Sequence, residues 1–169
     1  MPRRYRRRRT YALSKRVRYS NETYAAGAIS QWSKTSLYKS TLIAGTNVLG
    51  TRKCKNFTLT VSLKSAADSA DFVIPIYFAL VFVPEGTEAS TLNVGHTITD
   101  DVLQARSYYE PNQNVIFQGI VDHNQVYKFK TRLARNLNAG DTIQLIWSPY
   151  ENFEGTSLFT FTLNYALAF

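Results

Sequence analysis

Apolar and polar residues alternate along much of this chain with a period of two. The pattern is cleanest at residues 57–64 and 159–167, where Phe, Leu, Val and Tyr alternate with Thr, Ser, Lys and Asn. Successive side chains of a strand point to opposite faces, so both segments are predicted to be strands with one face in a core. Residues 72–83 are apolar throughout, with Pro75 near the start, which predicts a strand covered on both faces.

Less regular patterns predict further strands at residues 24–38, 115–121, 127–133 and 143–147. In the third of these, Tyr127, Phe129 and Leu133 are expected on the core side. Residues 97–109 fit either a strand or a short helix, and residues 20–23 are expected to be a polar hinge.

Turn-forming residues separate these segments. Residues 122–125 and 138–141 are predicted to be hairpin turns, and Gly119 within a strand predicts a bulge or a close approach of another segment. About eight strands without a long helix predict an all-β fold, an antiparallel sandwich or barrel. The length of 169 residues suits one domain, and the 44% of hydrophobic residues supply its core.

Positive charge is concentrated at one end of the chain. Nine of the 20 basic residues lie among residues 1–18, which contain no acid, so the remainder has eleven basic residues against twelve acidic ones. Such a segment repels itself and buries no apolar area, so we expect a disordered or extended arm at residues 1–20 and a nearly neutral body at residues 21–169.

The arm has the composition of a polyanion-binding segment. Arginine neutralises phosphates and releases counterions, and a tyrosine ring can stack on an unpaired base. The candidate nucleic-acid-binding residues are Arg3, Arg4, Tyr5, Arg6, Arg7, Arg8, Arg9, Tyr11, Lys15, Arg16 and Arg18. A second candidate group is Lys128, Lys130 and Arg132 on one strand face, which Arg52, Lys53 and Lys55 could join. The alternative for this group is an ordinary solvated sheet face.

Catalytic, metal-binding and cofactor-binding motifs are not found. His96 and His123 fall in predicted loops without a neighbouring nucleophile motif, and no phosphate-binding glycine loop is present. Cys54 lies between two lysines that could lower its pKa, but a packed small residue is the preferred interpretation. We therefore expect that the protein has no catalytic residue, no metal site and no cofactor. We also expect that it is not an enzyme.

Local phrases in the body resemble the capsid proteins of small circular single-stranded DNA viruses, the circovirus-like group that encodes a rolling-circle replication protein. Phe78–Gly86 (FALVFVPEG) is similar to a strand of that group that ends in a "VPxG" turn. Tyr109–Ile116 (YEPNQNVI), followed by Gly119-Ile120, and Arg132–Ile146 (RLARNLNAGDTIQLI) resemble two further segments. An arginine-rich arm ahead of a single all-β domain completes the resemblance.

The resemblance implies an eight-stranded jelly roll of two four-stranded sheets, assembled as a T=1 shell of 60 copies. It also implies that the arm packages a single-stranded DNA genome and acts as a nuclear localisation signal. The implied partners are this genome, the other copies of the chain, a host import receptor and an attachment receptor. The implied locations are the virion and, during assembly, the host nucleus.

Other functions are compatible with the same residues. A satellite-virus or RNA-virus capsid differs only in its cargo, because a basic arm does not distinguish DNA from RNA. A non-assembling, ribosomal-type nucleic-acid-binding protein would also carry a basic extension, and it would need a basic patch on its body. An extracellular lectin with a heparin-binding tail, an anionic membrane surface as partner and a mitochondrial presequence are further alternatives.

Overall fold

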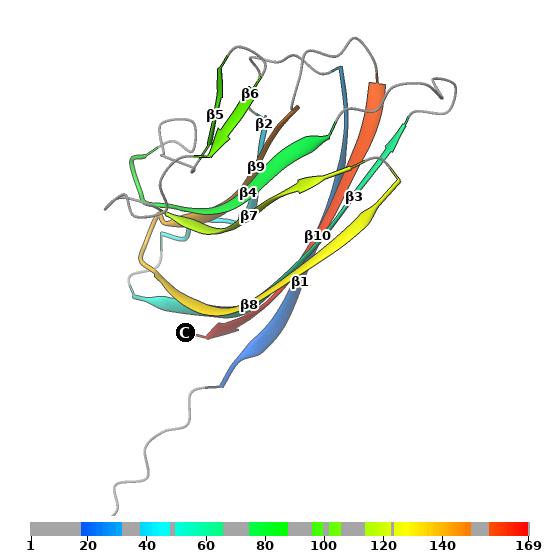
Figure 1. Ribbon diagram of the computed structural model, residues 1–169. Coiled ribbons are helices and arrows are strands. Elements are labelled where there is room, and N and C mark those ends of the chain that lie inside the picture. The colour runs from blue at the N-terminus through cyan, green and yellow to red at the C-terminus, as the bar shows by residue number, and fades with distance from the viewer. Residues whose placement is uncertain are drawn as a thin grey trace, which may run out of the picture.

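The computed structural model describes residues 18–31, 38–47, 50–65, 75–87, 96–99, 102–105, 114–122, 124–149 and 156–168. Two four-stranded antiparallel sheets form a sandwich (Figure 1). The first sheet has the order β1 (Ser20–Gln31), β10 (Thr156–Ala168), β3 (Arg52–Ser65), β8 (Val126–Leu137). The second has the order β2 (Tyr38–Ile43), β9 (Thr142–Pro149), β4 (Ile76–Val83), β7 (Val115–Val121). A separate pair consists of β5 (His96–Thr99) and β6 (Val102–Ala105).

The chain passes back and forth between the two large sheets. Strands β1, β3, β8 and β10 belong to the first sheet and β2, β4, β7 and β9 to the second, so nearly every connection crosses the sandwich. The exception is the passage from β4 to β7, which are antiparallel neighbours. Eight strands wound in this way in two sheets form a jelly roll. The prediction of an all-β jelly roll with two four-stranded sheets is confirmed.

The core lies between the two sheets and follows the alternation read from the sequence. Its largest cluster of buried side chains comes from the inward positions of both sheets, among them Phe57, Leu59, Val61, Leu63, Phe78, Leu80, Leu145, Trp147, Phe159, Phe161 and Leu163. The outward positions of β4 are buried as well, in a second cluster with Tyr77, Ala79, Val81, Val83 and Ile146. The prediction that this apolar strand is covered on both faces is therefore confirmed.

Two predicted hairpin turns are wrong. The described residues of the segment 122–125 and residues 138–141 do lie in turns, but the strands that they join, β7 to β8 and β8 to β9, belong to different sheets. Each turn therefore carries the chain across the sandwich. A short polar turn follows an apolar strand both in hairpins and in connections that cross between sheets. The sequence pattern therefore does not distinguish these two kinds of connection.

Three further expectations need correction. Ser20 begins β1 and residues 20–23 pair with β10, so they are a paired strand segment and not a hinge. The single strand expected at residues 24–38 is divided between β1, which ends at Gln31, and β2, which begins at Tyr38. In the ambiguous segment 97–109, the described residues belong to β5 and β6, which resolves it in favour of strands.

A β-bulge at Asn56 reverses which side chains of β3 face the core. Asn56 has a left-handed φ of 57°, and the pairing of β3 with β8 shifts register between Lys55 and Phe57. Phe57 is inward on one side of the bulge, and Cys54 is inward on the other. An extra residue in one strand has this effect because it breaks the period-two alternation. Leu133 lies at the same irregularity of β8 and is 46% exposed, contrary to its predicted place in the core.

The expected close approach at Gly119 is present. A Cβ atom at this position of β7 would lie 2.9 Å from Cζ of Phe129 and 3.1 Å from Cζ of Phe78. These two rings pack edge to face, with centroids 5.2 Å apart, and bring β8 of the first sheet against β4 of the second. A side chain at this position would force the Phe129 ring to shift, whereas glycine fits without any displacement.

The turn at residues 138–141 is held by its own carboxylate. Asp141 is buried and accepts hydrogen bonds from the backbone N–H of Asn138 (2.8 Å) and of Glu85 (3.1 Å). The N–H of Gly140 donates to the carbonyl of Thr46 at 3.0 Å. Three connections at this end of the sandwich are thus tied together. In the described residues, no helix is long and apolar enough to cross a membrane.

Candidate nucleic-acid interface

Most of the predicted arm residues lie outside the described part of the chain: Arg3, Arg4, Tyr5, Arg6, Arg7, Arg8, Arg9, Tyr11, Lys15 and Arg16. Arg18 is described and exposed, and it stands two residues before β1 begins. The point where the arm joins the body is therefore defined, at the edge strand of the first sheet.

The residue next to β1 contacts the body. The ammonium group of Lys55 lies 3.6 Å from the centroid of the Tyr19 ring, which is the geometry of a cation–π interaction. Lys55 belongs to β3, and β10 lies between β3 and β1 in the sheet. The contact places the root of the arm beside the outward surface of β3.

That outward surface carries most of the described positive charge of the body. The predicted Lys128, Lys130 and Arg132 are exposed and alternate with the inward Tyr127 and Phe129, as expected. Lys130 pairs with Thr58 of β3, and Lys128 pairs with Thr60. We define the basic face as the outward side of the first sheet with its six cations Lys53, Lys55, Lys64, Lys128, Lys130 and Arg132.

Register decides which of the other predicted cations belong to the basic face. Lys53 and Lys55 do, because the bulge at Asn56 turns them outward. Arg52 does not: it is only 8% exposed, and its Nη2 donates to the carbonyl of Ala44 at 2.9 Å. Lys64 is a member that the sequence-based prediction left out. Its place in the alternation of residues 57–64 was the available signal.

Hydroxyl and amide side chains lie beside the cations on the basic face. Thr58, Thr60 and Ser62 of β3 lie beside Asn164, Thr162 and Thr160 of β10. Thr23 of β1 donates to the side-chain oxygen of Asn164 at 2.7 Å. Such groups donate hydrogen bonds to phosphate oxygens as readily as to each other.

No described carboxylate stands on the basic face. The four described acids are Glu22, Glu85, Asp122 and Asp141. Glu85, Asp122 and Asp141 lie in connections between strands. Glu22 pairs with Tyr165, whose ring packs against the core; burial raises the pKa of Tyr165, and Glu22 raises it further. Among the described residues, the acids and the cations of the basic face therefore lie on different parts of the body.

The two outward surfaces of the sandwich differ in kind. The outward positions of β4 in the second sheet are apolar and buried, whereas those of β3 and β8 are polar and cationic. Like charges on neighbouring strands repel each other, and a polyanion lying across them relieves this repulsion. Contacts of this kind neutralise backbone phosphates and read no base sequence.

Cys54 is a packed core residue, as preferred from the sequence. It is fully buried, and burial raises the pKa of its thiol from 9.0 to about 11, against a smaller opposing effect of Arg52. Its two lysine neighbours point away from it, because Lys53 and Lys55 face outward while Cys54 faces the core. His123 lies outside the described residues. Among the residues that the structure describes, no group of three or more His, Cys, Asp or Glu side chains gathers as metal ligands would.

Comparison with solved structures finds chains of similar fold. No protein-family model matches the chain, and no curated protein matches it. The structure of infectious bursal disease virus, Gx strain, contains a chain that is similar over 92% of this chain, with 10% sequence identity and a TM-score of 0.41. This chain spans about a third of the length of that protein, 32%. The assignment of the fold rests on the strand order described above.

Proposed function

We propose that this protein is a viral capsid protein that assembles into a closed shell and binds the packaged nucleic acid with its basic arm. The observation that carries the proposal is that the arm root and the basic face lie on the same side of a jelly-roll body. A shell subunit needs one surface that faces a polyanion and other surfaces that pack against further copies. A body whose described cations lie mostly on one sheet face meets this need, since self-repulsion between neighbouring copies stays low elsewhere.

The finer statements follow from the resemblance described under Sequence analysis. They are a T=1 shell of 60 copies, a single-stranded DNA cargo, nuclear import through the arm, and a virion that is assembled in the host nucleus. The jelly-roll topology is compatible with each of them. The arm binds through phosphate charge, so we expect binding that is independent of sequence and weakened by salt.

Electron microscopy of the recombinant full-length chain at low ionic strength tests this proposal. Particles of uniform size are expected, and DNase should digest their cargo whereas RNase should not. A variant with Arg6, Arg7, Arg8 and Arg9 changed to Gln should form a body of unchanged thermal stability that packages less nucleic acid. A protein that stays monomeric with and without nucleic acid would contradict the proposal, and cargo sensitive only to RNase would replace DNA by RNA.

The basic face also favours a second candidate, a nucleic-acid-binding protein that does not assemble. Such a protein was expected to carry a basic patch on its body, and the segregated cations form one. The same microscopy separates the two candidates. Non-assembling binding predicts small complexes whose mass grows with the length of the nucleic acid, whereas a capsid protein predicts particles of one size.

A further inference from the structure

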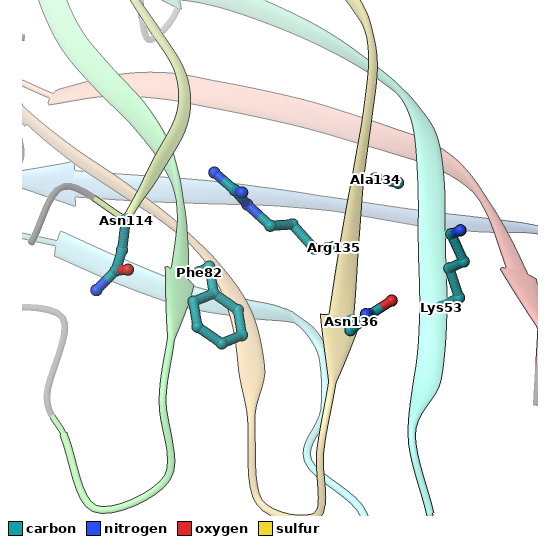
Figure 2. A pocket seen from close by; sticks show the side chains of 6 residues that line it. All are labelled: Lys53, Phe82, Asn114, Ala134, Arg135 and Asn136. Atoms are coloured by element: carbon teal, nitrogen blue, oxygen red, sulfur yellow. The ribbon is translucent and has the colours of Figure 1, made fainter.

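A cleft of about 510 Å³ opens at the rim of the sandwich, beside the edge strand β8. It is lined by Lys53 of β3, by Ala134, Arg135 and Asn136 of β8, and by Phe82 and Asn114 at the adjoining ends of β4 and β7 (Figure 2). The N–H of Phe82 donates to the carbonyl of Asn114 at 2.8 Å, which fixes one wall. The cleft therefore lies between residues of both sheets. The proposed function assigns no role to it.

Arg135 is the unusual residue of this cleft. It pairs with Cys54 of β3 and therefore faces inward, as the buried Leu137 does two residues further along β8. Figure 2 shows its side chain extending from β8 toward the side of Phe82 and Asn114. Its Nε is buried and has no hydrogen-bond partner within the described part of the chain. A buried, unsatisfied guanidinium donor is unfavourable unless an acceptor binds it.

Among the described residues that line the cleft, no side chain neutralises this charge. These six residues include no carboxylate, and Lys53 adds a second cation. The thiol of Cys54, opposite Arg135, has a pKa of about 11 and is therefore uncharged near neutral pH. A third cation, Arg52, stands one pair further along the same inward row of β3, opposite Leu137. The cleft is therefore electropositive and suited to an anion.

The remaining lining is suited to a base. Phe82 is partly exposed at the rim and packs its other side against the core, so its ring is a fixed apolar surface. Aromatic side chains of this kind stack on unpaired bases. Asn114 and Asn136 present amide groups that can both donate and accept hydrogen bonds, as base edges require. A guanidinium group that can donate hydrogen bonds to a phosphate, an aromatic ring and two amide groups are the parts of a nucleotide-binding site.

We propose that this cleft binds a nucleotide unit of a single-stranded nucleic acid, with the phosphate on Arg135 and the base against Phe82. The inference rests on the proposed function, because it takes the nucleic acid as the ligand. It extends that function, because it adds a binding site on the body to the binding segment formed by the arm. Lys53 belongs to both the basic face and the cleft. A single-stranded nucleic acid that crosses the basic face can therefore reach the cleft around the edge of β8.

Photocrosslinking of the full-length chain tests the site directly. The probe is a single-stranded oligothymidylate in which one thymine is replaced by 4-thiothymine, bound at moderate salt and irradiated. Mass spectrometry of the digested complex should place a crosslink on Phe82 or on the residues next to it, in addition to crosslinks on the arm. This measurement uses the unaltered protein and does not depend on the folding of a variant.

Binding of a labelled oligothymidylate by matched variants provides the second test. Arg135→Gln should weaken binding about 5-fold or more and remove the Phe82 crosslink, whereas Arg135→Lys should retain part of the affinity. Phe82→Leu should weaken binding at least about 5-fold through loss of base stacking. Lys39→Gln, which removes one cation from the second sheet, is the control and should leave the Phe82 crosslink in place.

The outcomes separate the cleft from the proposed function. A wild-type protein that binds oligothymidylate with crosslinks only in the arm, and with unchanged affinity in Arg135→Gln, would overturn the inference and leave the proposed function standing. A wild-type protein that binds no nucleic acid would overturn both.

Discussion

The ammonium group of Lys55 lies 3.6 Å from the ring centroid of Tyr19. This contact joins the residue that precedes β1 to the middle of the first sheet, and it sets the side of the body from which the arm departs. A cation–π contact between partly exposed groups contributes about 0.5–1 kcal/mol. A contact of this size holds the Tyr19 ring against β3 for much of the time and is weak enough to be displaced by a polyanion.

Removal of the Tyr19 ring should uncouple the root of the arm from β3. In a double-mutant cycle with Tyr19→Ala and Lys55→Gln, we expect a coupling energy of about 0.5–1 kcal/mol in urea unfolding. Tyr19→Phe should retain this coupling, because the ring face and not the hydroxyl contacts the ammonium group. Strictly additive effects of the two changes would show that the contact does not exist in solution.

Loss of a cation from the basic face should reduce the salt dependence of binding to single-stranded nucleic acid. Each phosphate contact contributes about 0.7 to the slope of log K against log salt concentration. Lys130→Gln should therefore lower the slope by about that amount, measured by fluorescence anisotropy over a series of salt concentrations. Lys39→Gln is the matched control: Lys39 pairs with Ile146 on the outward side of the second sheet, and its loss should leave the slope unchanged. Equal effects of the two changes would count against a role for the basic face.

Truncation of Asp141 should destabilise the body. Its carboxylate accepts the N–H groups of Asn138 and Glu85, and hydrogen bonds to a charged group contribute about 1.5–3 kcal/mol each. Asp141→Ala should lower the free energy of unfolding by about 2–4 kcal/mol, measured by urea denaturation. Asp141→Asn, which keeps one acceptor oxygen, should cost less. Asp122→Ala is the control for an exposed turn carboxylate, and an equally large loss there would refute the role assigned to Asp141.

Cys54 should make the body less stable at alkaline pH. Its pKa is about 11 in the folded protein against 9.0 for the free thiol, so between these values the unfolded chain loses the proton first. Stability from this group is complete below pH 9 and falls as the pH rises toward 11, by up to about 1.4 kcal/mol per pH unit.

The measurement is urea unfolding between pH 7 and pH 10, and the raised pKa of Tyr165, which contributes in the same direction near pH 10, is common to the wild-type protein and the variant. Cys54→Ala should lose stability at every pH through the cavity that it leaves, but its stability should depend less steeply on pH above 9. Wild-type and variant curves that stay parallel through pH 10 would show that the thiol does not titrate as described.

Much of the fold could be predicted because it depends on local alternation. The inward rows Phe57–Leu63 and Phe159–Leu163 are buried as predicted, and Lys128, Lys130 and Arg132 share the exposed side of β8. The arm and its charge are visible in the composition alone. No register shift falls within residues 57–63, 159–163 or 127–131, so period two suffices to assign each of these side chains to a face.

The sequence by itself determined an all-β fold, either a sandwich or a barrel, and a concentration of basic residues at one end, because alternation and charge are local properties. The tertiary structure alone decided how strands combine. It placed β7, β8 and β9 in alternating sheets where hairpins were expected, and its bulge at Asn56 turned Lys53 and Lys55 outward and Arg52 inward. It also brought Arg135 and Phe82 to one cleft from two sheets. The physical reason is that pairing between distant segments sets the register and the sheet to which a strand belongs. Such pairing leaves no periodic signal in the sequence of either segment.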